Sequence, residues 1–207
     1  MKQQTTLSHK TSGFREERFN NPEFANEYTA KHSKMSMKFA HKISALLSGK
    51  NFSPARILDS GCGSGLTLIE LAKKFPSCEC DGIDLSDPLL KIANNVNERE
   101  KLTKRVKFLK ADVQDIPFPN EYFDFIINLN MLHLVKEPVK MLNEIRRVLK
   151  PDGFFFIADL RKSFLGLIEK EIKSSFTFEE TRKTIDKSNL SNGKLSSELI
   201  FWRYQNL

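Results

Sequence analysis

Short apolar runs alternate with segments of helical periodicity through most of this chain. Runs that are apolar at consecutive positions and bounded by turn residues predict strands that are buried on both faces. Segments in which apolar residues recur every three or four positions predict amphipathic helices. The alternation therefore predicts an α/β fold with a doubly wound, mostly parallel sheet and helices on both of its faces. The expected strands are 55–60, 79–85, 106–112, 123–129 and 153–159, and the expected helices between them are 65–75, 87–101 and 137–149.

The region ahead of the sheet is also expected to be helical. Helices are predicted over 22–31 and 34–48, and together with the aromatic residues before them they form an expected N-terminal helical cap over 14–48. Residues 1–13, MKQQTTLSHKTSG, are polar, lack the apolar segment of a signal peptide and are expected to be disordered.

Behind the central strands, Thr177 and Glu180 have the spacing of a capping box, which predicts a helix that ends near residue 188. The residues KPDG at 150–153 predict a turn before the fifth strand, and the final SELIFWRYQN predicts the last strand. We expect a single domain. Its parts are a core over 55–160 and a C-terminal region of helices and a last strand over 161–207.

Composition limits the number of domains, the cellular environment and the kinds of partner that we expect. The 207 residues suffice for one α/β domain, and no apolar run approaches the roughly 20 residues of a membrane helix. The three cysteines, Cys62, Cys78 and Cys80, are too few for a disulfide framework, so we expect a reducing, cytoplasmic environment. The net charge is +7, but acids interleave with the basic residues, as in NEREKLTKRVKFLK. This favours a solvated basic surface over a nucleic-acid site.

The stretch ILDSGCGSG, residues 57–65, follows the first expected strand and precedes a helix. Gly61, Gly63 and Gly65 occupy alternate positions there, with Asp59 just ahead of them. Glycine permits a positive φ and a close approach of another group to the backbone, and a helix N-terminus adds unpaired N–H donors. The pattern predicts that a polar ligand lies against this turn.

Polar residues also follow the next strands. Ligands of open α/β sheets bind beyond the carboxyl ends of the strands. Asp84 ends the second strand and is placed to accept both hydroxyls of a ribose, and Asp112 ends the third, where it could accept from an exocyclic amine. Asn128 and Asn130 end the fourth strand and are expected to face the same cleft. Together these positions predict an adenosine site.

The kind of adenosine ligand follows from the charges. The glycine spacing is G-x-G-x-G, not the G-x-G-x-x-G of dinucleotide-binding turns, and no Lys-Ser or Lys-Thr of a P-loop follows it. Acids at 59, 84 and 112 would repel a pyrophosphate and suit a cationic adenosine that carries an ammonium group. The expected cofactor is S-adenosylmethionine.

The chain resembles the class I S-adenosylmethionine-dependent methyltransferases, in particular their compact small-molecule type. The similar segments are ILDSGCGSG, GIDLS, KADVQDIPFPNEYFDFII and LHLVKEPVKMLNEIRRVLKPDGFFFIAD, which cover roughly residues 55–160. The resemblance implies a seven-stranded Rossmann-like sheet that ends in an antiparallel hairpin, although the sequence shows only the last strand clearly. Asp152 stands where the family usually has a second glycine.

The resemblance also implies roles for individual residues. Gly61 and Gly63 would pack under the methionine part of the cofactor, with Asp59, Cys62 and Gly65 in the same cofactor-binding turn. Asp84 would hold the ribose hydroxyls, while Leu85, Asp112 and Val113 would contact the adenine and the Asn128 backbone would approach the methionine ammonium.

Several residues keep a second interpretation. Asp59 either contacts the cofactor or only accepts hydrogen bonds from backbone N–H groups of the loop. Cys62 is interpreted as a small loop residue, because no base is placed beside it for a nucleophilic role. His133 is either a packed histidine or a substrate contact, and Asn130 is a second candidate substrate contact. Tyr28 is either an ordinary helix aromatic or part of a lid over 14–32 that orders on the cofactor.

The resulting hypothesis is direct displacement of a methyl group from the sulfonium to a small-molecule acceptor, in which alignment matters more than acid–base chemistry. We expect no metal, name no general base, and expect a monomer or homodimer without a membrane span. Methylation of RNA and non-catalytic binding of S-adenosylmethionine are the alternatives.

Overall fold

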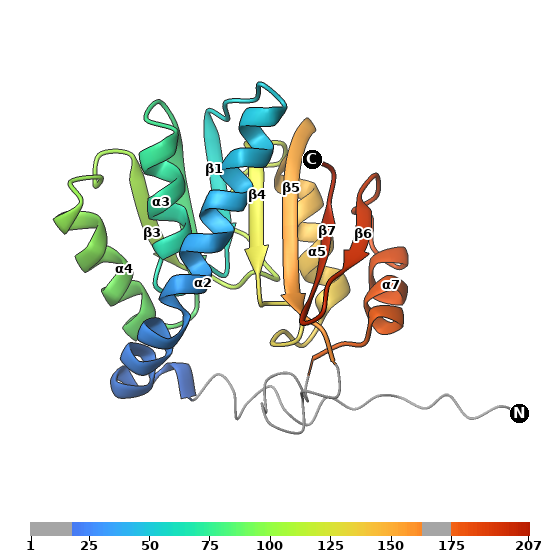
Figure 1. Ribbon diagram of the computed structural model, residues 1–207, viewed down its shortest axis with the longest axis horizontal. Coiled ribbons are helices and arrows are strands. Elements are labelled where there is room, and N and C mark those ends of the chain that lie inside the picture. Colours follow the sequence, from blue (N-terminus) through green and yellow to red (C-terminus); the bar gives the residue numbers. More distant parts are fainter. Residues whose placement is uncertain (1–17, 163–174) are drawn as a thin grey trace, which may run out of the picture.

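The computed structural model describes residues 18–162 and 175–207, so the tail expected to be disordered and the start of the cap at 14–17 lie outside the described residues. The described chain forms a seven-stranded sheet with the order β3-β2-β1-β4-β5-β7-β6 (Figure 1). The strands are β1 (Arg56–Ser60), β2 (Glu79–Asp84), β3 (Val106–Lys110), β4 (Phe123–Leu129), β5 (Leu149–Leu160), β6 (Lys194–Ser197) and β7 (Phe201–Gln205). Strands β1 to β5 are parallel, whereas β7 is antiparallel to both β5 and β6. The expected mostly parallel sheet is confirmed.

The antiparallel hairpin at the C-terminus is complete. The stretch SELIFWRYQN predicted one strand, but it contains the end of β6, a turn and all of β7. Strand β6 begins earlier, at Lys194, in a polar segment that has none of the apolar character of the central strands. An edge strand needs no apolar residues on both faces, which explains why the sequence pattern missed it.

Helices cover both faces of the sheet, as expected. They are α2 (Pro22–Gly49), α3 (Leu66–Lys74), α4 (Asp87–Arg99), α5 (Pro138–Val148) and α7 (Phe178–Asp186). Side chains alternate between the two faces along each strand. Thus Leu58 packs in the core beneath α5 and α7, while its neighbour Ile57 packs in the core beneath α2 and α3. The predicted capping box of Thr177 and Glu180 is present at the start of α7.

Helix α2 is one continuous helix, which corrects the prediction of separate helices over 22–31 and 34–48. The Asn21 side chain accepts a hydrogen bond from Phe24 N at 3.0 Å, and Pro22 occupies the first turn, so the helix begins at the expected break. No glycine or proline follows until Gly49. Ser33, at the expected boundary, donates its hydroxyl back to Ala30 O, which a helix tolerates.

Strand β5 begins at Leu149, so the expected KPDG turn at 150–153 lies within the strand as an irregularity. Phe123 pairs with Leu149 and Phe125 with Phe154, which leaves extra residues on β5 between the two pairs. Bulges of this kind insert residues into one strand without ending it. The expectation that KPDG forms a turn ahead of the fifth strand is therefore wrong, because the strand runs through these residues.

In Figure 1 the arrowheads of β4 and β5 point to the bottom of the view, so the carboxyl ends of the parallel strands lie there. The N-terminal end of α2 lies at the same edge of the molecule. The order of the strands reverses between β1 and β4, and this is the place where open α/β sheets bind ligands.

Candidate functional site

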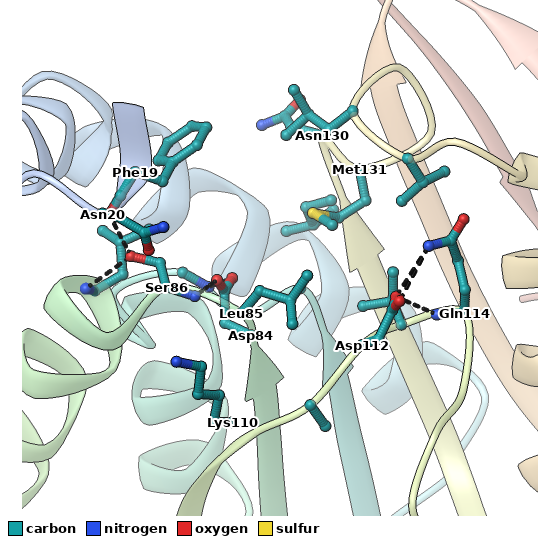
Figure 2. Close-up of a pocket in the computed structure, with 18 of the residues that line it drawn as sticks. Phe19, Asn20, Asp84, Leu85, Ser86, Lys110, Asp112, Gln114, Asn130 and Met131 are labelled. Atoms are coloured by element: carbon teal, nitrogen blue, oxygen red, sulfur yellow. Dashed lines mark hydrogen bonds between the residues drawn. The ribbon is translucent and has the colours of Figure 1, made fainter. Parts of the chain in front are cut away.

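A cavity of about 320 Å³ opens at this switch point, beyond the carboxyl ends of β1 to β4 (Figure 2). Its wall brings together residues far apart in the sequence: Gly61 and Gly63 after β1, Asp84 and Leu85 after β2, Asp112 and Val113 after β3, and Asn130 after β4. Tyr28 of α2 completes the set of predicted residues that line it. Most of the predicted site residues therefore share one cavity.

The glycine turn has the conformation that its composition predicts. Gly61, Gly63 and Gly65 all have positive φ, at 85°, 52° and 72°. A Cβ atom at Gly61 would lie 2.4 Å from the Met131 side chain, and one at Gly65 would lie 2.5 Å from the Phe108 ring. Gly65 lines neither the 320 Å³ cavity nor the smaller one beside it, so its absent side chain serves helix packing.

Asp84 links the second strand to the glycine turn. Its Oδ2 accepts a hydrogen bond from Gly63 N at 2.8 Å and its Oδ1 accepts one from Ser86 N at 2.9 Å. Burial raises the pKa of Asp84, although the N–H groups of Ser86, Gly63 and Leu85 oppose this shift. The carboxylate thus faces the cavity with its charge held mainly by backbone dipoles.

Asp59 lies on the other side of the turn, where it lines a smaller cavity of about 70 Å³. It is 2% exposed, and its Oδ1 has no hydrogen-bond partner. Burial, together with the nearby charge of Asp84, raises the pKa of Asp59 to about 7. The same causes, with burial again the largest, raise the pKa of the neighbouring Cys62 thiol, which therefore lacks the thiolate character of a nucleophile.

Asp112 is held by a residue that the sequence interpretation missed. Its Oδ1 accepts hydrogen bonds from Gln114 N at 2.8 Å and from Gln114 Nε2 at 3.1 Å. The other end of the same carboxamide, Oε1, accepts from Glu137 N at 2.8 Å, ahead of α5. Gln114 lines the cavity beside Val113, and only the tertiary contact to Glu137 reveals its bridging position.

The asparagines of the fourth strand separate, which corrects the expectation that both face the cleft. Asn128 is fully buried, and its side chain donates to Ser60 O at 2.7 Å away from either cavity. Asn130 lines both cavities and has a left-handed φ of 57°. Residues two apart share a face only while the strand continues, and β4 ends at Leu129.

His133 lies outside both cavities, with its side chain 4% exposed. Its Nδ1 is 2.6 Å from Asp159 Oδ1, and its backbone N–H donates to Asp159 Oδ2 at 3.1 Å. The packed interpretation thus describes its surroundings in this structure. Asp159, near the end of β5, was missed because its partner, His133, follows a different strand and is distant in the sequence.

The N-terminal segment reaches the site directly. Phe19 and Asn20 line the cavity beside Tyr28, and Ser86 Oγ donates to Phe19 O at 2.6 Å (Figure 2). The same hydroxyl accepts from Leu89 N at 3.2 Å and so caps α4. One serine therefore joins the segment ahead of α2 to the strand that carries Asp84.

Apolar side chains complete the remaining wall. Met131, Leu134 and Val135, from the segment after β4, line the same cavity as Leu85, which is 44% exposed. Nothing in the sequence pattern distinguished these three residues from core positions. In the described parts of the chain, no helix combines the length and the apolar character needed to cross a membrane.

The fold and the site together define an α/β protein with a doubly wound sheet and an acid-lined cavity at its switch point. Residues 58–157 match the family model of a methyltransferase domain. A structure of a candidate S-adenosylmethionine-dependent methyltransferase from Methanococcus maripaludis has the same fold, with a TM-score of 0.74 over 99% of this chain and 95% of that chain at 18% identity. The chain belongs to the class I S-adenosylmethionine-dependent methyltransferase family.

The curated relatives include methyltransferases that are named for a small-molecule acceptor. A fatty-acid O-methyltransferase of Mycolicibacterium smegmatis is 33% identical over 109 residues, which cover 53% of this chain and 38% of the relative. A phthiotriol/phenolphthiotriol dimycocerosates methyltransferase of Mycobacterium leprae is 30% identical over 155 residues, which cover 72% of this chain and 56% of the relative. The chain thus matches about half or less of the length of these relatives.

Proposed function

We propose that this protein transfers a methyl group from S-adenosylmethionine to a small, largely apolar acceptor. The observation that carries the proposal is the pair of buried carboxylates, Asp59 and Asp84, whose pKa values are raised chiefly by burial. Asp84 lines the larger cavity and Asp59 the smaller one beside it. Buried carboxylates at such a place favour a positively charged ligand, because a cation offsets the cost of their burial. S-adenosylmethionine carries a sulfonium and an ammonium group.

The other lining residues fit the remaining parts of this cofactor. Asp84 would accept from the ribose hydroxyls and Asp112 from the adenine amine, and Leu85 offers an exposed apolar surface to the adenine ring. Gly61 and Gly63 line the cavity and would pack under the methionine part, and the absent side chain of Gly61 makes room for Met131 beside it. When bound, the cofactor supplies an electrophilic methyl group.

The contribution of this chain to the reaction is alignment and exclusion of water. Direct displacement requires the acceptor atom to lie in line with the methyl group at roughly 3 Å. Met131, Leu134 and Val135 form an apolar wall that would hold an acceptor against this position. The names of the relatives, a fatty-acid and a dimycocerosate methyltransferase, support an acceptor with apolar character. A cytoplasmic location is part of the same proposal.

Calorimetric titration with S-adenosylmethionine and S-adenosylhomocysteine tests the cofactor, with NAD as the control ligand. We expect both to bind and NAD not to. The acceptor is then sought by incubating the protein with cell extract and cofactor carrying a deuterated methyl group and detecting labelled products by mass spectrometry. Labelled lipid-like products support the proposal. Labelled RNA with strongly salt-dependent binding would establish the nucleic-acid alternative, and cofactor binding without any labelled product would establish a non-catalytic binding protein.

A further inference from the structure

The positive charge of the chain is concentrated in one stretch. Residues 28–58 contain six lysine or arginine residues and no aspartate or glutamate, so this stretch accounts for +6 of the net charge of +7. Four of the six are lysines of α2, at positions 31, 34, 38 and 42. None of these four lysines lines either cavity of the candidate site. Their charge therefore has no role in the site described above.

Most of these lysines form a stripe on the outer side of α2. Lys31, Lys34, Lys38 and His41 follow one another at intervals of three or four residues, which places them on one side of a helix. All four side chains are exposed. The opposite side of α2 is buried against the sheet, which the helix crosses in Figure 1. The basic stripe, defined by these four residues, thus faces away from the protein.

The middle of the basic stripe has no acidic partner within the described chain. Lys42, further along α2, pairs with Glu198 at 3.1 Å, whereas Lys34 and Lys38 form no ion pair with any described residue. Like charges four residues apart on a helix repel each other and reduce its stability. An anionic partner outside the chain would offset this repulsion. A second copy of the protein would not, because two such stripes repel each other.

The residue types in the stripe indicate which kind of anion it fits. Helix α2 contains no arginine, whose planar guanidinium recognises individual phosphate groups through paired hydrogen bonds. Lysine is a point charge that suits a diffuse layer of negative charge. The aromatic residues of α2, Phe24, Tyr28 and Phe39, are all at least partly buried, so none is freely presented for stacking on nucleic-acid bases.

An apolar side chain lies among the charges. Met37 is 46% exposed and comes three residues after Lys34 and four before His41, so it borders the stripe on the helix surface. A surface of lysines with an exposed apolar side chain fits a lipid interface, where cations meet anionic headgroups and apolar groups enter the boundary of the acyl chains. A free polyanion in water would gain nothing from Met37.

We propose that the basic stripe of α2, with Met37 beside it, docks on the surface of a bilayer that carries anionic lipid headgroups. The choice of a lipid surface rests in part on the proposed function, because an apolar acceptor is concentrated in a bilayer. Tyr28, His32 and Met35, from the same turns of α2, line the smaller cavity beside the glycine turn. Docking would therefore bring the site within about 10 Å of the lipid, the diameter of one helix.

The test is sedimentation with vesicles of phosphatidylcholine, alone or mixed with phosphatidylglycerol. The wild type should bind the mixed vesicles, release them at high salt, and bind phosphatidylcholine alone only weakly. The double variant Lys34→Gln/Lys38→Gln should bind the mixed vesicles about 10- to 30-fold more weakly, since each lysine near such a surface contributes a similar amount. The control Lys104→Gln/Lys187→Gln removes the same charge from exposed positions outside residues 28–58 and should bind as the wild type does.

Met37→Ser separates a lipid surface from other polyanions. It should weaken binding to mixed vesicles and leave binding to a single-stranded RNA oligomer, which serves as the competing polyanion, unchanged. Three results would each overturn the inference: equal loss of vesicle binding in the two double variants, equal wild-type binding to both kinds of vesicle, and displacement of the protein from vesicles by the RNA oligomer.

The proposed function is tested separately in the same proteins. Lys34 and Lys38 line neither cavity, so calorimetric titration should give the wild-type affinity for S-adenosylhomocysteine in all variants. Retained cofactor binding without vesicle binding would overturn the inference and leave the proposed function standing. Vesicle binding without cofactor binding would have the reverse meaning. Circular dichroism melting confirms that each variant is folded.

Discussion

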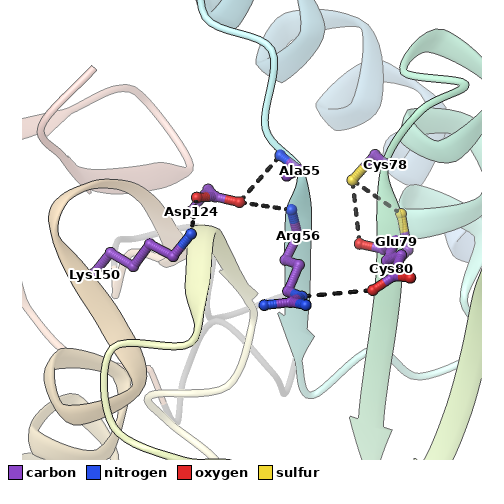
Figure 3. Close-up of polar contacts among 7 residues, drawn as sticks. All are labelled: Ala55, Arg56, Cys78, Glu79, Cys80, Asp124 and Lys150. Carbon is purple, nitrogen blue, oxygen red and sulfur yellow. Dashed lines mark hydrogen bonds and ion pairs between the residues drawn. The ribbon is translucent and has the colours of Figure 1, made fainter.

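The pKa values of aspartate side chains are shifted in opposite directions at the two ends of the parallel sheet. At the amino end, Asp124 Oδ2 accepts from Ala55 N at 3.0 Å and from Arg56 N at 2.7 Å, and Asp124 Oδ1 accepts from Lys150 Nζ (Figure 3). Burial alone would raise the pKa of Asp124, but Lys150 and the two N–H groups outweigh burial and lower it. At the carboxyl end, burial raises the pKa of Asp59 and of Asp84.

The difference shows where the protein favours stability and where it favours binding. At the amino end, charged side chains are paired within the protein. Beside Asp124, the Arg56 guanidinium forms an ion pair with Glu79 and also lies over the Tyr122 ring. At the carboxyl end, groups are left without protein partners, which reduces stability and prepares a site for a ligand. Substitutions at the two ends should therefore have opposite effects on folding and different effects on cofactor binding.

The largest expected effect is that of Asp59→Asn on folding. The pKa of Asp59 is about 7 in the folded protein, against an ordinary value of 3.8. The folded state therefore binds more protons than the unfolded state in this range. Stability from this group is fully present below pH 3.8 and is lost as the pH rises through 7. At about 1.4 kcal/mol for each pKa unit, ionised Asp59 costs up to about 4 kcal/mol at pH 8.

Asp59→Asn removes this cost, so its free energy of unfolding should exceed that of the wild type at pH 8, and the difference should shrink to near zero at pH 4. Urea denaturation at both pH values measures it. The same variant should bind S-adenosylhomocysteine more weakly. A difference that did not depend on pH would contradict the assignment of the raised pKa to Asp59.

The second effect concerns Asp84→Asn and the cofactor. If the carboxylate accepts from both ribose hydroxyls, its neutralisation should cost about 2–4 kcal/mol of cofactor affinity. Asparagine retains one acceptor oxygen for the N–H groups of Gly63 and Ser86 that Asp84 holds, so the turn should persist. Calorimetric titration with S-adenosylhomocysteine measures the loss. Unchanged affinity in a variant with a wild-type melting curve would refute the ribose role.

Asp124→Ala should have the reverse signature. Loss of the ion pair and of two backbone hydrogen bonds should lower the free energy of unfolding by about 1–3 kcal/mol at pH 7 and leave cofactor affinity unchanged. Because the pKa of Asp124 is lowered, its contribution is present above the ordinary value of 3.8 and is lost as the pH falls through the folded-state pKa. Urea denaturation at pH 7 and pH 3 should show the difference shrink. The exposed Asp152→Ala serves as the control.

The smallest expected effect tests the predicted lid. Hydrogen exchange should show that amides of residues 18–32 gain protection when S-adenosylhomocysteine is added. Ser86→Ala removes the bond to Phe19 O, so this gain should diminish, at a cost of about 0.5–2 kcal/mol for the lost cap of α4.

Thr177→Ala removes a comparable cap, that of α7, and should leave the gain in protection intact. Equal protection of residues 18–32 with and without ligand would mean that this segment is a static flank of the site.

Local chemistry accounts for the parts of the site that could be predicted. Gly61 and Gly63 predict a positive φ, because other residues rarely adopt it. Asp84 could be placed at the site because the carboxyl ends of parallel strands meet at one edge of the sheet. Asn128 was misplaced because alternation along a strand does not say where the strand ends. Gln114 and Asp159 were missed because their partners, Glu137 and His133, are supplied by other elements.

By itself, the sequence determined the alternating fold, the glycine turn, the acids at the strand ends and the family, because each depends on periodicity or on residues close together in the chain. Only the tertiary structure decided that α2 is continuous, that β6 completes the hairpin, and that Thr29, Asp59 and Asn130 meet at one cavity. Hydrogen bonding explains this division. A residue type shows that a side chain can bond, but only the packed chain shows whether its partner is already present.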